Sequence, residues 1–285
     1  MVPKAAVIND LSGFGRCSLT AAISVIASMG VQPVPMPTAV LTAQTGYPSY
    51  YCDDFTDRMP RFTEEWGKMQ VSFDGIYTGF VLGEKQVDAI FGFLDRFYEE
   101  KTVLLVDPVL GDDGLPYGIY SHGLRSRIRE LTELSDIMTP NLTELCLLTG
   151  HDFKTVMEKD VDALFEEIEK AGKELLNKPE KKIVVTGIRY TDPENGQLMV
   201  GNQLISKEGS EVIAFSCCPG SFSGTGDLMA SALMGGVLRG DTLSDTVSLA
   251  GSFLHKAISD AVNEKTNKND GVPYEPYLSL LQKKG

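Results

Sequence analysis

Residues 217–233 read CCPGSFSGTGDLMASAL, in which a small-residue turn leads through one carboxylate, Asp227, into an apolar stretch of helical character. The first turn of a helix presents unpaired backbone N–H groups and a partial positive charge, so it binds anions. Glycines at this point let a phosphate approach those N–H groups. Asp227 would repel a phosphate unless it accepts a hydroxyl proton during phosphoryl transfer. The structural alternative is a plain glycine turn with a first-turn acid.

On both sides of this turn along the chain, short apolar runs rich in β-branched residues alternate with longer runs of helical period. This alternation predicts an α/β fold with a mostly parallel, doubly wound sheet covered by helices on both faces. We expect strands at 4–10, 31–38, 74–80, 102–108, 136–140 and 181–187, and helices at 18–30, 86–100, 142–150, 161–176, 226–240 and 244–262. The prolines of 31–38 indicate an edge or irregular strand, and 197–205 with 211–217 indicate an antiparallel pair. Without a repeat or a long linker, we expect one domain over residues 1–285.

The totals narrow the class of protein. A formal net charge of −13 over 285 residues argues against nucleic-acid and anionic-membrane partners, because both need basic surfaces. The start of the chain lacks the pattern of a signal peptide, and no apolar run is long enough to span a bilayer. Five cysteines without C-x-x-C spacing indicate free thiols, and three histidines without metal spacing argue against a zinc enzyme. We therefore expect a cytoplasmic protein.

Polar residues follow the expected strands at their carboxyl ends. In open α/β sheets, ligands bind at that edge. Each of these residues alone could be a helix cap or a turn residue, but the set as a whole predicts a binding site. Its members are Asn9, Asp10, Asp107, Thr139, Asn141 and Thr186.

Two further segments carry carboxylates suited to a metal–nucleotide complex. In VDPVLGDDG (106–114), we expect Asp112 and Asp113 in a flexible loop that supplies hard oxygen ligands, with a solvated turn as the alternative. In TPNLTEL (139–145), Glu144 could hold the water shell of a metal. Asn141 and Glu144 also have the spacing of a capping box, which we favour, although the two roles can coexist.

Two common nucleotide motifs are absent or incomplete. DLSGFGRCS (10–18) lacks the third glycine of the dinucleotide fingerprint, so a dehydrogenase is poorly supported. The sequence also contains no G-x-x-x-x-G-K-[ST] phosphate loop.

Six segments together resemble the vitamin kinases of the ribokinase superfamily, most closely the pyridoxal kinases. They are LTAQTGY (41–47), TGF (78–80), VDPVLGD (106–112), TPNLTEL (139–145), VVTG (184–187) and SGTGDL (223–228). Their order is that of the family and they cover nearly the whole chain. The resemblance implies a three-layer α/β/α sandwich, a homodimer, and transfer of the ATP γ-phosphate to the 5′-hydroxymethyl group of a pyridine.

The resemblance also implies roles for individual residues. Asp227 is expected as the catalytic base, with Gly224, Thr225 and Gly226 as the anion hole. Asp112 and Glu144 are expected at Mg²⁺–ATP, Asn141 near the phosphates, Thr186 at the nucleotide, and Asp107 and Thr139 near a K⁺ ion. Thr45, Tyr47 and Phe80 are expected at the pyridine, with Asp10 and Ser12 also on the substrate side.

Two departures from the pyridoxal kinases leave the acceptor open. Asn9 and Asp10 replace a common Gln-Ser pair, and Gln44 stands where many members carry histidine. The segment DLSGFG (10–15) instead resembles hydroxymethylpyrimidine kinases, so that acceptor is the alternative. A sugar or nucleoside kinase, and a carrier that binds a B6 vitamer without catalysis, are more distant alternatives.

Two other features suggest roles in the same reaction. Cys217 or Cys218 could add reversibly to the aldehyde of pyridoxal if its thiol were partly ionised, although strand-end cysteines usually act as small buried hydrophobes. Phosphoryl transfer also needs water to be excluded, and the polar and aromatic segment 47–61 is our candidate for a closing element.

Overall fold

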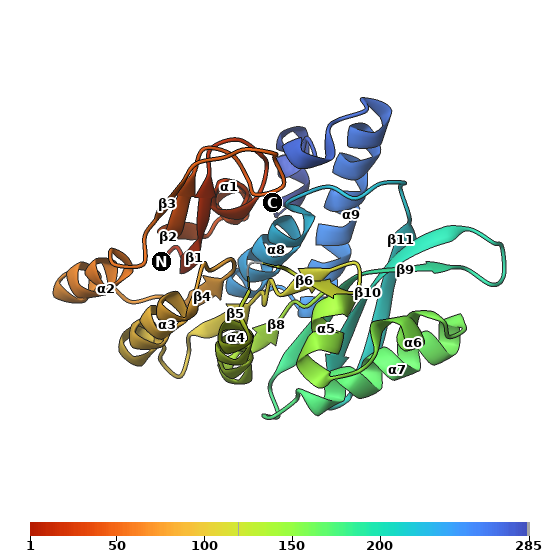
Figure 1. The fold of residues 1–285 in the computed structure, drawn as a ribbon, viewed down its shortest axis with the longest axis horizontal. Helices are drawn as coiled ribbons and strands as arrows, with labels where there is room; N and C mark the ends of the chain where they lie inside the picture. Colours follow the sequence, from red (N-terminus) through yellow and green to blue (C-terminus); the bar gives the residue numbers. More distant parts are fainter. Residues whose placement is uncertain (119, 284–285) are drawn as a thin grey trace. The chain divides into compact units, whose positions relative to one another are not determined.

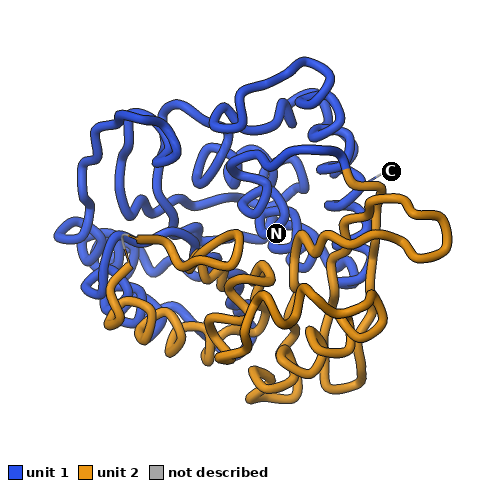
Figure 2. The backbone as a smooth tube through the Cα atoms, turned by 45° about the vertical axis from the view of Figure 1, so that its right-hand side comes forward, with its two compact units in different colours: residues 1–105, 218–285 blue, residues 106–217 orange. Residues whose placement is uncertain are grey.

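The computed structural model describes residues 1–118 and 120–283. The chain divides into two compact units (Figure 2). Unit 1 consists of Met1–Leu105 and Cys218–Gly285, and unit 2 consists of Val106–Cys217. The expectation of a single domain over the whole chain stays a prediction.

The strands of unit 1 follow the order β5-β4-β1-β2-β3. Their bounds are β1 (Lys4–Ser12), β2 (Gln32–Leu41), β3 (Cys52–Asp54), β4 (Gly75–Thr78) and β5 (Val103–Val106). β1 pairs in parallel with both β2 and β4. Its residues Ala5, Ala6, Val7 and Ile8 are fully buried, as expected for a parallel strand covered on both faces.

β2 confirms the expectation drawn from its prolines. β3 pairs only with Ala39, Val40 and Leu41, so the proline-bearing first half of β2 is hydrogen-bonded to β1 alone. Proline has no N–H to donate to a neighbouring strand. At an edge position no second strand lies beside it, so no carbonyl group is left without a donor.

The helices of unit 1 form two packed groups (Figure 1). One group consists of α1 (Ser18–Ser28), α8 (Thr225–Arg239) and α9 (Leu243–Asn263), with the 3-10 helices η1 (Lys268–Asp270) and η2 (Glu275–Leu281) following α9. The other group consists of α2 (Met59–Lys68) and α3 (Glu84–Phe97). Between α2 and α3, Trp66 packs edge-on against Phe93, which also contacts Phe73 and Phe97.

Unit 2 combines parallel and antiparallel pairing. Its strands follow the order β8-β9-β10-β11, with bounds β8 (Ile137–Met138), β9 (Lys182–Thr191), β10 (Leu198–Ser206) and β11 (Gly209–Ser216). β8 and β9 are parallel, whereas β9, β10 and β11 pair antiparallel, which confirms the expected antiparallel pair. A separate hairpin joins β6 (Gly111–Asp112) to β7 (Leu115–Pro116).

Four helices complete unit 2: α4 (His122–Leu134), α5 (Leu142–Thr149), α6 (Phe153–Met157) and α7 (Val161–Glu174). α5 and α7 pack on each other and on β9. The α/β class with a mixed, mostly parallel central sheet and flanking helices is therefore confirmed. Across residues 1–118 and 120–283, no helix is both long and apolar enough to cross a membrane.

Lys181, directly before β9, is a lysine buried to 1% exposure. Its Nζ donates to the Thr132 carbonyl near the end of α4 at 2.6 Å. That carbonyl also accepts a hydrogen bond from the Ser135 hydroxyl at 2.7 Å, so it would keep a hydrogen-bond donor if Lys181 were replaced. Burial, followed by the neighbouring charge of Lys178, lowers the pKa of Lys181 to about 8.

We expect Lys181→Met to raise the free energy of unfolding at pH 7 by about 1–3 kcal/mol, because the folded state then buries no ammonium group. The depressed pKa means that the unfolded chain binds the proton more tightly. The destabilisation of the folded state by the wild-type lysine is therefore complete below pH 8. It decreases as the pH rises toward the ordinary lysine pKa of 10.5. Urea unfolding at pH 7, 8.5 and 10 measures the difference in free energy of unfolding between Lys181→Met and wild type, which should become smaller at each step. The half-buried neighbour serves as control through Lys182→Met, and a Lys181→Met protein less stable than wild type at pH 7 contradicts the prediction.

Candidate active site

The turn that begins α8 requires glycine at its first position. Gly224 has φ +85°, and a Cβ added to it would lie 2.0 Å from the Arg16 carbonyl oxygen. Gly224 is the N-cap of α8 and caps it without a side-chain hydrogen bond. Thr225 and Gly226 follow as the first residues of the helix, so their N–H groups belong to the uncapped first turn. The local geometry is that of an anion-binding helix N-terminus.

Asp227 occupies the same first turn and is half-buried. Burial, and then the charge of Asp10, raises its pKa to about 6, although the backbone of Ser18 and the side chains of Asn9 and Tyr77 favour the ionised form. The Asn9 amide Nδ2 donates to Asp227 Oδ1 at 3.0 Å. A carboxylate with a pKa near 6 can accept a proton at neutral pH, which is what a general base requires.

Asn9 connects Asp227 to two other parts of unit 1. Its Oδ1 accepts the Asp10 N–H at 3.0 Å and the Phe80 N–H at 2.9 Å. A Cβ on Gly79 would lie 2.6 Å from the Asn9 amide nitrogen, so only glycine leaves room for this side chain. Sequence reasoning placed Asn9 at a strand end but gave it no role. The available signal was its departure from the residue common in the pyridoxal kinases.

Asp10 and Ser12 lie together at the end of β1, which continues to Ser12, two residues beyond the predicted strand. Asp10 is 4% exposed, and the Ser12 hydroxyl donates to its Oδ2 at 2.8 Å. Burial raises the pKa of Asp10, while hydrogen bonds from Ser18 and Ser12 oppose that rise. Ser18 has φ +52°, which is a strained backbone conformation for a residue with a side chain. The strain therefore occurs at a residue that contacts both Asp10 and Asp227.

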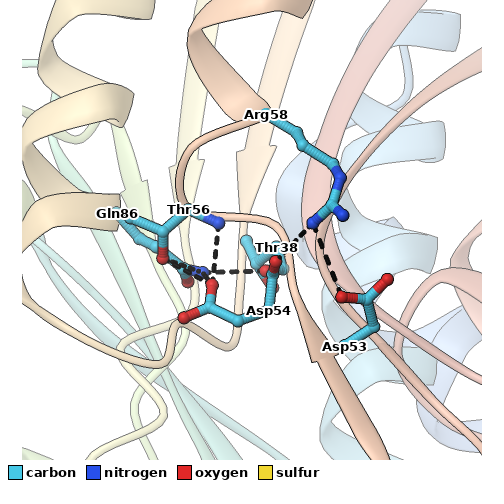
Figure 3. Close-up of polar contacts among 6 residues, drawn as sticks. All are labelled: Thr38, Asp53, Asp54, Thr56, Arg58 and Gln86. Carbon is cyan, nitrogen blue, oxygen red and sulfur yellow. Dashed lines mark hydrogen bonds and ion pairs between the residues drawn. The ribbon is translucent and has the colours of Figure 1, made fainter.

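Phe80 is held by its backbone on two sides. Besides its bond to Asn9, its carbonyl accepts the Thr38 hydroxyl at 2.9 Å. The Thr38 carbonyl accepts Gln86 Nε2 at 2.7 Å, and the same amide donates to Asp54 and Thr56 (Figure 3). Gln86 is fully buried.

This network also fixes part of the segment 47–61. Asp54 Oδ1 accepts the Thr56 N–H at 2.7 Å, and Arg58 donates to the Asp54 carbonyl at 2.8 Å (Figure 3). Residues 48–51 of the same segment contain no helix or strand and are exposed. The closing role of the segment stays a prediction, and any such movement would have to come from the part before Asp54.

Thr45 and Tyr47 lie in the loop after β2. Thr45 is exposed, whereas Tyr47 packs edge-on against Phe14 with ring centroids 5.6 Å apart. The Tyr47 hydroxyl donates to Asp270 Oδ1. Gln44 is turned inward, donating to the Asn269 carbonyl at 3.1 Å and accepting the N–H of Gly46 at 2.7 Å. Gln44, which departs from the pattern of the pyridoxal kinases, therefore holds the loop after β2 through these two hydrogen bonds.

In unit 2, Asp112 lies in a β-hairpin and not in the flexible loop that the sequence predicts. Asp113 and Gly114 have φ +49° and +78°, the paired positive values of a type I′ turn between β6 and β7. Asp112 is exposed, and its Oδ1 accepts the Asp113 N–H at 2.9 Å. The sequence predicts a loop at Asp112-Asp113-Gly114, but these residues form the turn of a hairpin.

Asn141 and Glu144 form the capping box of α5, as favoured from their spacing. Asn141 Oδ1 accepts the Glu144 N–H at 2.9 Å, and Glu144 Oε2 accepts the Asn141 N–H at 2.8 Å. Glu144 Oε1 accepts the Leu110 N–H at 2.8 Å, and Asn141 Nδ2 donates to the Gly111 carbonyl at 2.8 Å. The cap thus ties the β6 hairpin to α5. Burial raises the pKa of Glu144 to about 7 against these backbone donors.

Thr186 does not end its strand, as the sequence suggested, because β9 continues to Thr191. The pairing with β10 shifts register between Val185 and Ile188, so Thr186 and Gly187 form a bulge opposite Asn202. Thr186 pairs with Asn141 across an isolated parallel bridge, and its N–H donates to the Pro140 carbonyl at 2.9 Å. Two residues predicted at the nucleotide are therefore adjacent.

Thr139 and Asp107 follow β8 and β5. Thr139 is 4% exposed, and its hydroxyl has no hydrogen-bond partner among the described residues. Asp107 is half-buried. In residues 1–118 and 120–283, no group of three or more histidine, cysteine or acidic side chains is arranged to hold a metal ion by itself.

Cys217 and Cys218 are half-buried at the end of the antiparallel pair. Within unit 1, Cys218 Sγ lies 3.8 Å from His255 Nδ1. The proposed addition of a thiol to an aldehyde stays a prediction.

Comparisons with known proteins bear on the whole chain. A family model described as phosphomethylpyrimidine kinase matches residues 15–271. A Bacteroides thetaiotaomicron structure provisionally assigned to the same kinase, crystallised with pyridoxal, is 31% identical, with a TM-score of 0.89 over 99% of this chain and 96% of that chain. The pyridoxal kinase structure from Lactobacillus plantarum is 26% identical, with a TM-score of 0.86 over 99% and 97%.

A curated relative extends the same pattern. The pyridoxal kinase of Dictyostelium discoideum is 24% identical over 99% of this chain and 94% of its own length. The resemblance read from the six segments is therefore confirmed.

The two ends of α8 offer a matched test of the glycine turn. Gly240 caps the far end with φ +89° and has no atom within 4 Å of an added Cβ, whereas Gly224 meets the Arg16 carbonyl. Gly240→Ala should cost only the strain of a positive φ, about 1 kcal/mol. Gly224→Ala should lower the free energy of unfolding by about 1–3 kcal/mol more, because the loop at Arg16 must shift. Urea unfolding measures both, and equal costs would exclude the close approach.

Proposed function

Because the chain belongs to the phosphomethylpyrimidine kinase family, we propose that this kinase transfers the γ-phosphate of ATP to the 5′-hydroxymethyl group of pyridoxal, pyridoxine or pyridoxamine. The observation that carries the proposal is Asp227, a carboxylate with a pKa of about 6 in the uncapped first turn of α8. The helix dipole favours an acid in this turn, but the acid would repel a bound phosphate, so its presence there is explained if it accepts a proton in a reaction on that phosphate.

In the proposed reaction, Asp227 accepts the proton of the acceptor hydroxyl as its oxygen attacks the phosphorus atom. Asn9 orients the carboxylate through its 3.0 Å hydrogen bond. The N–H groups of the turn formed by Gly224, Thr225 and Gly226 stabilise negative charge on the transferred phosphoryl group. Asp10, Ser12, Thr45, Tyr47 and Phe80 are assigned to the acceptor.

We assign the nucleotide and its ions to residues of unit 2, with Asn141 and Thr186 at the phosphates and nucleotide. Some of the residues assigned to Mg²⁺ and K⁺ have side-chain oxygens that could bind a cation. Asp112 is exposed and its Oδ1 accepts the neighbouring Asp113 N–H. The buried Thr139 hydroxyl lacks a protein partner among the described residues, as a K⁺ ligand would. Glu144 already accepts backbone N–H groups at both oxygens, so it would act on Mg²⁺ through water, and Asp107 would be near K⁺.

Hydroxymethylpyrimidine is the second candidate acceptor. It is favoured by the opening DLSGFG (10–15), whose Asp10 is buried and hydrogen-bonded to Ser12. The relative crystallised with pyridoxal supports the B6 reading instead. Both acceptors are flat heteroaromatic rings with a primary alcohol, so the phosphoryl chemistry is the same. A cytoplasmic homodimer stays a prediction.

The direct test is ATP consumption by the purified protein with Mg²⁺ and K⁺, offered each of the three B6 vitamers and hydroxymethylpyrimidine in parallel. We expect turnover on a vitamer, and a loss of at least about a hundredfold in Asp227→Asn with nucleotide affinity unchanged. Turnover on hydroxymethylpyrimidine alone would name the second candidate. Binding of a vitamer without any turnover would favour the carrier and refute the proposal.

The pH dependence of kcat/KM tests whether Asp227 is the base, because substitutions at Asn9 and Asp10 should shift its pKa in opposite directions. Activity should rise with pH through about 6, as Asp227 loses its proton. Asn9→Asp keeps the acceptor oxygen but places a second carboxylate beside Asp227, so the acidic limb should move up by about one pH unit or more. Asp10→Asn removes a charge that raises the pKa of Asp227, so the limb should move down. Limbs that stay in place in both variants would exclude Asp227 as the titrating base.

A further inference from the structure

The residues 267–271, here called the 267–271 segment, follow α9 and contain η1. Their sequence, NKNDG, carries none of the family motifs quoted above. The segment nevertheless contacts three loops of unit 1: the first acceptor loop (13–16, after β1), the second acceptor loop (44–47, after β2) and the turn before α8. The contacts to each loop are distinct.

The second acceptor loop is bound at three points. Asn269 accepts Gln44 Nε2 at its carbonyl, at 3.1 Å, and donates its Nδ2 to the Gly46 carbonyl at 2.8 Å. Asp270 Oδ1 accepts the hydroxyl of Tyr47. The backbone carbonyl of Asn269 thus fixes the Gln44 end of this loop, and the side chains of Asn269 and Asp270 fix its other end.

The other two loops are bound through the backbone. The Arg16 N–H donates to the Asp270 carbonyl at 3.1 Å, and the Ser223 N–H donates to the Lys268 carbonyl at 3.0 Å. Gly271 has φ +75°, and a Cβ on it would lie 2.8 Å from Arg16 Cβ and 3.1 Å from the Ser223 carbonyl oxygen. The first acceptor loop and the turn before α8 therefore meet at this segment.

The part of the second acceptor loop fixed by Asp270 has the surface of a ring-binding site. Phe14 is 58% exposed and packs edge-on against Tyr47 at 5.6 Å. Tyr47 is half-buried, so the exposed ring of Phe14 and the accessible part of Tyr47 offer an apolar contact for a flat heteroaromatic ring. Asp270 restricts rotation of the Tyr47 hydroxyl and ring, which reduces the entropy that ligand binding would otherwise lose.

We propose that the 267–271 segment is a positioning element for acceptor binding, in which Asp270 holds Tyr47 and the backbone joins both acceptor loops to the turn that carries Asp227. This inference rests on the proposed kinase function. It assigns Asp270 as a positioning residue that acts through Tyr47, without contact to the reacting atoms.

The test compares Asp270→Ala, Tyr47→Phe and the double variant. Each single variant removes the same hydrogen bond from one side, so the double variant should be no worse than the weaker-binding single variant. We expect the Kd for pyridoxine without nucleotide, and the KM for pyridoxine, to rise about tenfold in each. The KM for ATP should stay within about twofold, because only the acceptor side is disturbed.

Three controls separate positioning from folding. Asp270→Asn keeps an acceptor oxygen for Tyr47 and should restore most of the pyridoxine affinity. Glu275→Gln breaks the neighbouring exposed pair with Arg16 and should leave both KM values unchanged. Urea unfolding checks that each variant is folded, and a merely structural role would alter activity with both substrates alike.

The two proposals fail in different ways. A wild-type protein that neither binds nor phosphorylates pyridoxine refutes the B6 assignment, and the variants are then compared with hydroxymethylpyrimidine. An active wild type whose acceptor affinity is unchanged in Asp270→Ala and Tyr47→Phe overturns the positioning role alone. So does a double variant whose loss is the product of the two single losses.

Discussion

The hydrogen bond from Asn9 to Asp227 is the interaction on which the chemistry of unit 1 depends. Asp227 lies in the first turn of α8 near a second carboxylate, Asp10, and its own charge is disfavoured by burial and by that like charge. One amide donor, the Ser18 backbone and Tyr77 offset that cost enough to leave its pKa near 6. A carboxylate balanced in this way can both hold and release a proton near neutral pH.

The same side chain explains several constraints that are far apart in the sequence. Asn9 Oδ1 also accepts the N–H groups of Asp10 and Phe80, so the end of β1, the loop after β4 and the first turn of α8 are fixed together. Gly79 is required beside it for lack of space. Asn9 and Asp10, which stand where the resemblance to pyridoxal kinases leads us to expect a Gln-Ser pair, therefore build this network and place a second acid near Asp227.

Local patterns predicted most of the fold and part of the site. The buried run of β1, the prolines of β2 and the Asn141–Glu144 spacing each express a rule that involves only near neighbours, and each was confirmed. The bulge at Thr186 and the hairpin at Asp112 were misread, because strand length and turn type depend on pairing with other segments. The 267–271 segment escaped notice because its contacts are to residues about 45 to 255 positions away.

Asp227 and Glu144 show why a raised pKa alone does not identify a base. Burial raises the pKa of both, to about 6 and about 7. Glu144 accepts backbone N–H groups at Oε1 and Oε2, and each bond holds a piece of the capping box or the β6 hairpin. Its protonation would break structural contacts, so its carboxylate serves the fold first. Asp227 is held by the Ser18 backbone and by the Asn9 and Tyr77 side chains, and these contacts close no helix cap; it lies in a turn whose glycines leave backbone N–H groups uncapped. The distinction lies in what each carboxylate already holds together, and it favours Asp227 over Glu144 as the base of the proposed reaction.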